Sequence, residues 1–159
     1  MINNKKLQAM NYLKNEFIKL QNDPPIVTLG CTVGLIDNNL FKWRVSIMGP
    51  SDTPYAGGMF FLTVEFPEDY PIGKPKVNFQ TKIYHVNISP MDGQICVSTL
   101  KYWKPNTPFS SVMISIFALF YNQNANDPFS PQLAQVYKSN YPQYVQNARE
   151  WTKKYASMD

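Results

Sequence analysis

The sequence predicts an α+β fold with an N-terminal helix, a four-stranded antiparallel meander, a long loop and then three helices. Three observations lead to this prediction. Apolar residues recur every three or four positions near the N-terminus and again after residue 108, which is the spacing of a helical face. They alternate with polar residues between residues 27 and 79, as in half-buried strands, whereas residues 81–106 follow neither period. At 159 residues, the chain is expected to form a single domain, residues 1–159.

The first helix is predicted over residues 5–21. One of its faces is apolar and the others carry lysine and asparagine, so the helix should lie on the surface of the domain. Asp23, Pro24 and Pro25 are expected to end it, because the residue before a proline is disfavoured in the helical conformation. The apolar face consists of Leu7, Met10, Leu13, Phe17 and Leu20.

Alternation of apolar and polar residues predicts four strands. They cover residues 27–35, 43–47, 60–66 and 77–79. Asp37, Asn38 and Asn39 favour a tight turn between the first two strands. Because the connections between successive strands are short, an antiparallel meander is expected. Cys31 lies on the apolar face of the first strand and is interpreted as a core residue.

Three helices are predicted in the last third of the chain. Thr107 is expected to cap the first of them, with Pro108 at its first position, and the apolar run 109–121 indicates that this helix is buried. Ser130 is expected to cap a short second helix. The residues expected to face the core are Leu133, Val136 and Tyr137 in the second helix, and Tyr144, Ala148, Trp151 and Tyr155 in the third.

Composition argues against several classes of function. The net charge is +4 and the lysines are spread along the chain, so nucleic acid binding, which needs clustered basic residues, is not expected. No apolar run approaches the ~20 residues of a membrane span, and no membrane partner is expected. The two cysteines cannot form a disulfide framework, and nothing resembles a metal cluster. We therefore expect no metal site and a reducing cytoplasmic or nuclear location.

Residues 84–98 are the stretch with the clearest chemical character. The only histidine, His85, stands close to Asn87 and Cys96. Between Asn87 and Cys96, four turn-forming residues should fold the chain back: Ser89, Pro90, Asp92 and Gly93. Most free cysteines are buried and inert, but a cysteine in a turn-rich loop near amide and imidazole groups favours a nucleophile. Considered alone, these residues also allow a cysteine hydrolase in which His85 is the base.

Several short motifs follow one another along the chain. They are Met48–Pro50, Tyr55–Phe61, Phe66–Pro67, Tyr70–Pro71, Pro75–Val77, Tyr84–His85, Asn87–Ile88, Gly93, Ile95–Cys96, Trp103 with Pro105, and Asp127–Pro128. In this order and spacing they resemble the ubiquitin-conjugating enzymes, and the resemblance extends from about Leu7 to Ala156. The chain is most similar to the short, core-only members that work with many RING and HECT ligases. The fold of that family agrees with the fold predicted above.

The resemblance implies that Cys96 accepts ubiquitin from an activating enzyme as a thioester and passes it to a substrate lysine or a ligase cysteine. Asn87 would stabilise the oxyanion or the loop itself, and Asp127 would help an incoming lysine to attack. These three residues form the implied catalytic set. The residues implied to order the loop are His85, Asn124 and Ser98.

The resemblance also implies partners and a docking surface. The expected partners are ubiquitin, the ubiquitin-activating enzyme, RING or HECT ligases and substrate proteins. No cofactor is expected, because ATP is consumed upstream by the activating enzyme. Ligase docking is assigned to a surface formed by the first helix and two loops, with the candidate residues Lys5, Ile72, Trp103, Pro105 and Asn106.

The chain departs from the family pattern at several positions. Val86 stands where the motif has proline, and the turn between Asn87 and Cys96 is longer than in the most similar group. Ile72 stands where ligase-binding members often carry phenylalanine, and Leu29 lies near the serine used for non-covalent ubiquitin binding. Two alternatives therefore stay open: a carrier of another ubiquitin-like modifier, and an inactive variant that only positions ubiquitin.

Overall fold

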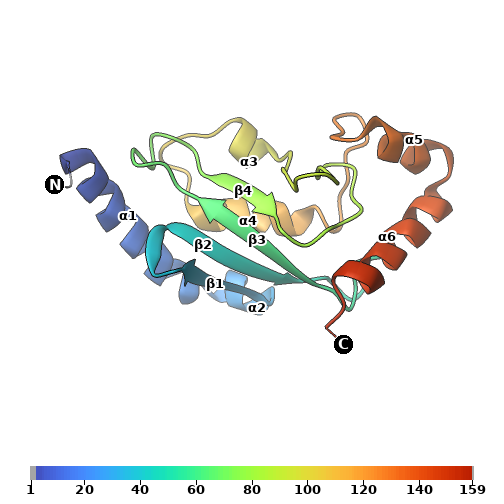
Figure 1. Ribbon diagram of the computed structural model, residues 1–159, viewed down its shortest axis with the longest axis horizontal. Helices are drawn as coiled ribbons and strands as arrows, with labels where there is room; N and C mark the ends of the chain where they lie inside the picture. The colour runs from blue at the N-terminus through green and yellow to red at the C-terminus, as the bar shows by residue number, and fades with distance from the viewer. Residues whose placement is uncertain (1–2, 159) are drawn as a thin grey trace.

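The computed structural model describes residues 3–158 and confirms an α+β fold with an N-terminal helix, a four-stranded antiparallel sheet and C-terminal helices. In chain order the elements are α1 (Asn4–Gln21), α2 (Pro24–Thr28), β1 (Cys31–Ile36), β2 (Asn39–Met48), β3 (Met59–Glu65), β4 (Lys76–Phe79), α3 (Ser98–Lys101), α4 (Phe109–Ala118), α5 (Pro131–Ser139) and α6 (Tyr141–Tyr155). Helix α4 covers one face of the sheet, α1 lies beyond one end of it, and α5 and α6 lie beyond the other (Figure 1).

The sheet is a meander with the strand order β1-β2-β3-β4. Val45 pairs with Val33 on one side and with Leu62 on the other, so apolar side chains of neighbouring strands line the same face. Asp37 and Asn38 have positive φ angles of 53° and 56°. That conformation fits the tight turn which joins twisted antiparallel strands, and the predicted turn is confirmed.

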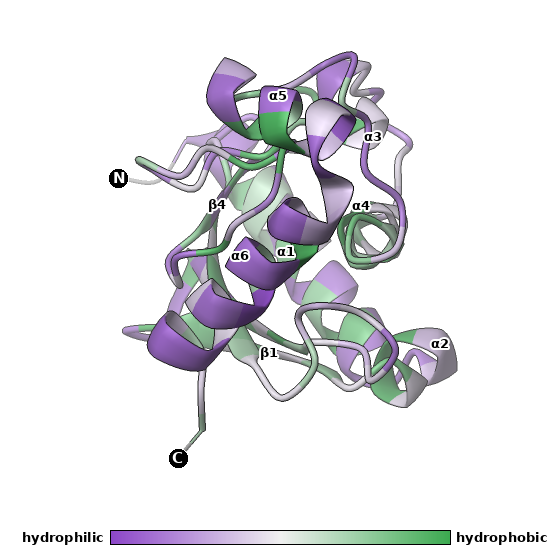
Figure 2. Cartoon of the chain, turned by 90° about the vertical axis from the view of Figure 1, so that its right-hand side faces the viewer, coloured by the Kyte–Doolittle hydropathy of each residue, from purple (hydrophilic) through white to green (hydrophobic). Residues whose placement is uncertain are grey.

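The core between the sheet and α4 is built largely from aromatic side chains. Trp43 is fully buried, and its ring centroid lies 5.4 Å from that of Phe109 and 4.5 Å from that of Phe66. Inclined ring pairs at these distances add about 0.5–1.5 kcal/mol each beyond the burial of their area. Cys31 belongs to the same core, as predicted. Figure 2 shows the resulting contrast between the largely hydrophobic α4 and the largely hydrophilic α6.

Two short helices are absent from the sequence-based prediction. Alternation predicts a strand from Val27, but residues 24–28 form α2, and β1 begins only at Cys31. The cause is the Pro24-Pro25 pair: proline favours the first helical positions, where its fixed φ fits the helix and its missing N–H is not needed. The second short helix, α3, lies within the segment predicted to be irregular.

Several helix boundaries and faces also differ from the prediction. The predicted Thr107 cap is wrong: Pro108 is the N-cap residue of α4, which has no side-chain cap. Helix α4 ends at Ala118 rather than continuing to residue 121. The Ser130 cap of α5 is confirmed, because its hydroxyl accepts the N–H of Leu133. Leu7 and Tyr155, predicted to face the core, are exposed.

Candidate active site

The segment before Cys96 forms a hairpin, as the turn-forming residues predict. Ile88 bridges to Ile95, and the N–H of Cys96 donates to the carbonyl of Asn87 at 2.9 Å. Gly93 is required at its position, because its φ is +75° and a Cβ there would lie 1.9 Å from the carbonyl oxygen of Phe79. The hairpin therefore holds Cys96 beside Asn87, two residues before α3 begins at Ser98.

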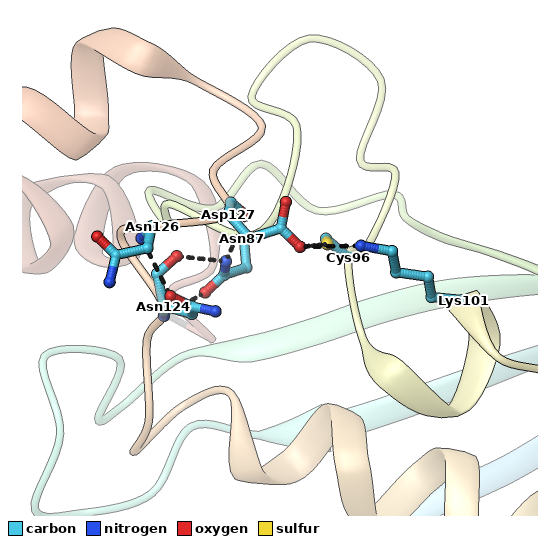
Figure 3. Close-up of polar contacts among 6 residues, drawn as sticks. All are labelled: Asn87, Cys96, Lys101, Asn124, Asn126 and Asp127. Carbon is cyan, nitrogen blue, oxygen red and sulfur yellow. Dashed lines mark hydrogen bonds and ion pairs between the residues drawn. The ribbon is translucent and has the colours of Figure 1, made fainter.

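Cys96 opens into a groove of about 450 Å³ that Asp127 and Lys101 also line. The Cys96 Sγ–H donates to Asp127 Oδ2 at 3.3 Å, and Lys101 Nζ lies 3.5 Å from the same oxygen. Figure 3 shows the thiol and the ammonium meeting at this carboxylate. One carboxylate oxygen thus faces both a nucleophile and an amine.

The Cys96 thiol is protonated at rest. Its pKa is raised by partial burial first, and then by the hydrogen bond to Asp127 and the negative charge of that carboxylate; Lys101 opposes the shift. A thiolate on Cys96 therefore has to form at the moment of reaction rather than beforehand. The Lys101 ammonium is in turn held charged, because Asp127 raises its pKa.

Asn87 is a buried amide with all of its strong hydrogen-bonding groups engaged. Its Nδ2 donates to the carbonyls of Asn124 at 2.9 Å and Asp127 at 3.1 Å, and its Oδ1 accepts the N–H of Asn124 at 2.8 Å (Figure 3). Both amide hydrogens are therefore committed to the segment that carries Asp127. The arrangement favours the loop-supporting role of Asn87 over the oxyanion role.

His85 is fully buried and does not face the thiol as a base. Its Nδ1 accepts the N–H of Asn87 at 3.0 Å, so the ring proton is on Nε2, which donates to the carbonyl of Leu119 at 2.6 Å. Burial lowers the pKa of His85 to about 4, and the ring is neutral at physiological pH. Both ring nitrogens are occupied, which argues against a cysteine hydrolase that uses His85 as the base.

The remaining loop residues lie around the same groove. Asn124 meets Asn87 through its backbone, and its side chain accepts the N–H of Asn126 at 3.0 Å. Ser98 is exposed at the start of α3, and its carbonyl accepts the N–H of Tyr102. Both residues line the groove together with Cys96.

The predicted docking residues come from α1, from the loop that follows Pro71 and from the segment after α3. Trp103 Nε1 donates to the carbonyl of Pro71 at 2.8 Å, which joins the loop bearing Ile72 to the segment after α3. Ile72 is 66% exposed, a large exposure for an apolar side chain. Lys5, Pro105 and Asn106 are also exposed, and Asn106 shares a smaller cleft with Tyr12 and Glu16 of α1.

Lys101 is absent from the sequence-based site. It lies five positions after Cys96, and only the single turn of α3 returns its side chain toward the groove. A helix of four residues is too short to show a helical period in the sequence, so the sequence contains no signal for this contact. Within residues 3–158, no group of three or more His, Cys, Asp or Glu side chains is placed to hold a metal ion. None of the helices in the described part of the chain is both long and apolar enough to cross a membrane.

Comparisons with known proteins give a family match and similar solved structures. A family model described as ubiquitin-conjugating enzyme matches residues 12–152. The structure is similar to the E2 domain of a ubiquitin-conjugating enzyme of Toxoplasma gondii, with a TM-score of 0.83 and 34% identity over 92% of this chain and 99% of that one. It is also similar to a candidate ubiquitin-conjugating enzyme of Plasmodium yoelii, with a TM-score of 0.86 and 34% identity over 100% of both chains.

Proposed function

Because the chain belongs to the ubiquitin-conjugating enzyme family, we propose that it carries ubiquitin as a thioester on Cys96 and transfers it to an amine or to a ligase thiol. The observation that supports this most directly is the placement of the Cys96 thiol beside the Asp127 carboxylate in an open groove. A thiol suits the task, because sulfur is both a good nucleophile and a good leaving group in acyl transfer.

In the charging step, the Cys96 sulfur attacks the thioester carbonyl that links ubiquitin to the activating enzyme, and that enzyme's thiol leaves. The proton of Cys96 must depart as the new bond forms. Asp127 Oδ2 already accepts the S–H hydrogen bond and is placed to receive that proton. The free energy of the transfer is carried by the incoming thioester, so this step requires no cofactor of its own.

In the discharge step, a lysine amine attacks the thioester carbonyl and the Cys96 sulfur leaves. A free lysine has a pKa of ~10.4, so only about one molecule in a few thousand is neutral at pH 7. An acylated Cys96 has no proton to donate, which frees Asp127 Oδ2 to hold an ammonium and take its proton. The 3.5 Å contact with Lys101 supports this role, since that oxygen already holds an ammonium beside the sulfur.

Charging with labelled ubiquitin, an activating enzyme and ATP tests the proposal. The expected product is an adduct of one ubiquitin that disappears on treatment with a reducing thiol. A parallel reaction with another ubiquitin-like modifier and its own activating enzyme tests the alternative carrier. An inactive variant would give no thiol-sensitive adduct in either reaction, and that result would overturn the proposal.

We infer RING or HECT ligases and substrate proteins as the further partners.

Replacing Asp127 by alanine is expected to slow discharge to free lysine by about a hundredfold at pH 7, because the amine loses its proton acceptor. The deficit should shrink toward pH 9, where the neutral fraction of lysine is about a hundredfold larger. Charging should change little, since loss of the carboxylate also removes two causes of the raised pKa of Cys96. Single-turnover discharge of the purified thioester measures both effects.

Lys101→Ala is the companion variant for that experiment. It removes the ammonium that occupies Asp127 Oδ2, so the apparent KM for free lysine should fall while the maximal rate stays close to that of the parent. If Asp127→Ala discharged at the same rate as the parent protein at every pH from 7 to 9, the role assigned to this carboxylate would be ruled out.

Ile72→Ala is expected to reduce ligase-stimulated discharge by about fivefold or more while charging stays intact. The minority of interface residues whose truncation costs more than ~1 kcal/mol of binding energy cluster near the centre of the interface, where the docking assignment puts Ile72. Val27, a branched apolar residue that is 59% exposed on α2, provides the matched control Val27→Ala. Equal stimulation of the parent and Ile72→Ala by several RING ligases would exclude Ile72 from the docking surface.

A further inference from the structure

We propose that Tyr144, on α6, is a positioning residue that holds the active-site loop through a hydrogen bond from the backbone N–H of Val86. The inference rests on the proposed function, because it names a residue that sets the geometry of that same site. Tyr144 lies outside the groove that Cys96 opens into, and none of its contacts is with the reacting sulfur. Its action on the reaction is therefore through Val86.

Val86 is the point at which two distant segments meet the loop. Its side chain is fully buried, its N–H donates to Tyr144 Oη at 3.0 Å, and its carbonyl accepts the N–H of Phe129 at 2.9 Å. Tyr144 comes from α6, and Phe129 follows the segment that carries Asp127. Both backbone groups of one residue thus join the C-terminal helix to the segment that forms the far wall of the groove.

The Tyr144 ring is itself packed between other tyrosines: its centroid lies 5.1 Å from that of Tyr84 and 5.0 Å from that of Tyr137. The Tyr55 O–H donates to the carbonyl of Tyr84 at 2.7 Å, so a second tyrosine holds the backbone just before Val86. The Tyr144 hydroxyl oxygen accepts from the Val86 N–H, so two tyrosine hydroxyls contact the backbone of residues 84–86.

The hydrogen bond to Tyr144 matters because this chain has an N–H at position 86. A proline, which stands here in the motif that the sequence resembles, has no N–H and needs no acceptor. A buried N–H without an acceptor is costly, and the Tyr144 hydroxyl removes that cost. The next residue, Asn87, holds the carbonyl of Asp127 and accepts from Asn124. Loosening Val86 should therefore shift the Asp127 carboxylate relative to Cys96.

The decisive experiment is a double-mutant cycle with Tyr144→Phe and Val86→Pro, measured as single-turnover discharge of the thioester to free lysine. In the parent, Tyr144→Phe should slow discharge by roughly tenfold, because the buried N–H loses its acceptor. In the Val86→Pro background there is no N–H to lose, so adding Tyr144→Phe should change the rate by less than about twofold. An equal factor in both backgrounds would overturn the proposal.

Two further measurements separate positioning from stability and from failure of the proposed function. Tyr70→Phe is the matched control, because the buried Tyr70 hydroxyl has no hydrogen-bond partner in the described structure, and its removal should leave discharge unchanged. Amide hydrogen exchange at Val86 and Phe129 should accelerate in Tyr144→Phe while the amides of β2 stay protected. Unchanged exchange at Val86 would refute the proposal even if the parent formed no thioester, whereas absence of the thioester would refute only the proposed function.

Discussion

Replacing Cys96 by alanine is expected to abolish the thiol-sensitive ubiquitin adduct, whereas Cys31→Ala should charge at close to the parental rate. The two cysteines differ in exposure and in acidity. Burial raises the pKa of the Cys31 thiol to about 11, so almost none of it is ionised at neutral pH, and the residue belongs to the core at the start of β1. Cys96 is partly exposed, lines the groove and has a proton acceptor at 3.3 Å. Charging followed on a non-reducing gel measures the difference.

The pH dependence of charging provides a second check on the same assignment. Because the pKa of Cys96 is raised above its ordinary value, the thiolate is a minor species at pH 7 and grows as the pH rises. Where sulfur attack limits the rate, charging should accelerate by about tenfold per pH unit until the pKa is approached. An adduct that persists in Cys96→Ala and disappears in Cys31→Ala would reverse the assignment of the nucleophile.

Most of the fold was predictable because its elements follow a regular period. The alternation of Trp43, Val45 and Ile47 with polar residues identifies β2, and the Asp37–Asn39 turn identifies the meander. The prediction of secondary structure is wrong where a local feature of the sequence outweighs the spacing of apolar residues. In α2, the Pro24-Pro25 pair starts a helix in a stretch whose apolar spacing is that of a strand. Helix α3 spans only four residues, too few for any period to be read.

The candidate site was predictable as a set of chemical groups but not as an arrangement. Cys96, Asn87 and Asp127 were identified by residue type and by resemblance, and the structure brings them to one groove, although their catalytic roles stay predictions. Lys101 and Tyr144 were not identified as site residues. Their contacts depend on one turn of α3 and on the packing of α6 against residues 84–86, which are tertiary features that residue spacing does not encode.

Asn87→Ala is expected to slow discharge by about a hundredfold and to lower the melting temperature by several degrees. The substitution removes the three hydrogen bonds that tie Asn87 to Asn124 and Asp127, and it leaves the buried partners without their amide. Each such loss costs about 1–3 kcal/mol, which corresponds to a few degrees for a domain of this size. A misplacement of the carboxylate by ~1 Å is enough to cost about a hundredfold in rate. Discharge measured well below the melting temperature separates the rate effect from unfolding.

The double variant Asn87→Ala/Asp127→Ala distinguishes support of the loop from direct stabilisation of the oxyanion. If Asn87 acts by holding Asp127, removing the carboxylate in addition should cost little, because a displaced carboxylate has already lost its function. If Asn87 instead donates to the oxyanion, the two losses should multiply, since an independent donor of that kind contributes ~10²–10³ in rate. The commitment of both Nδ2 hydrogens to the carbonyls of Asn124 and Asp127 favours the first result. Asn126→Ala, which truncates an exposed amide in the same segment, is the matched control and should leave both the rate and the melting temperature unchanged.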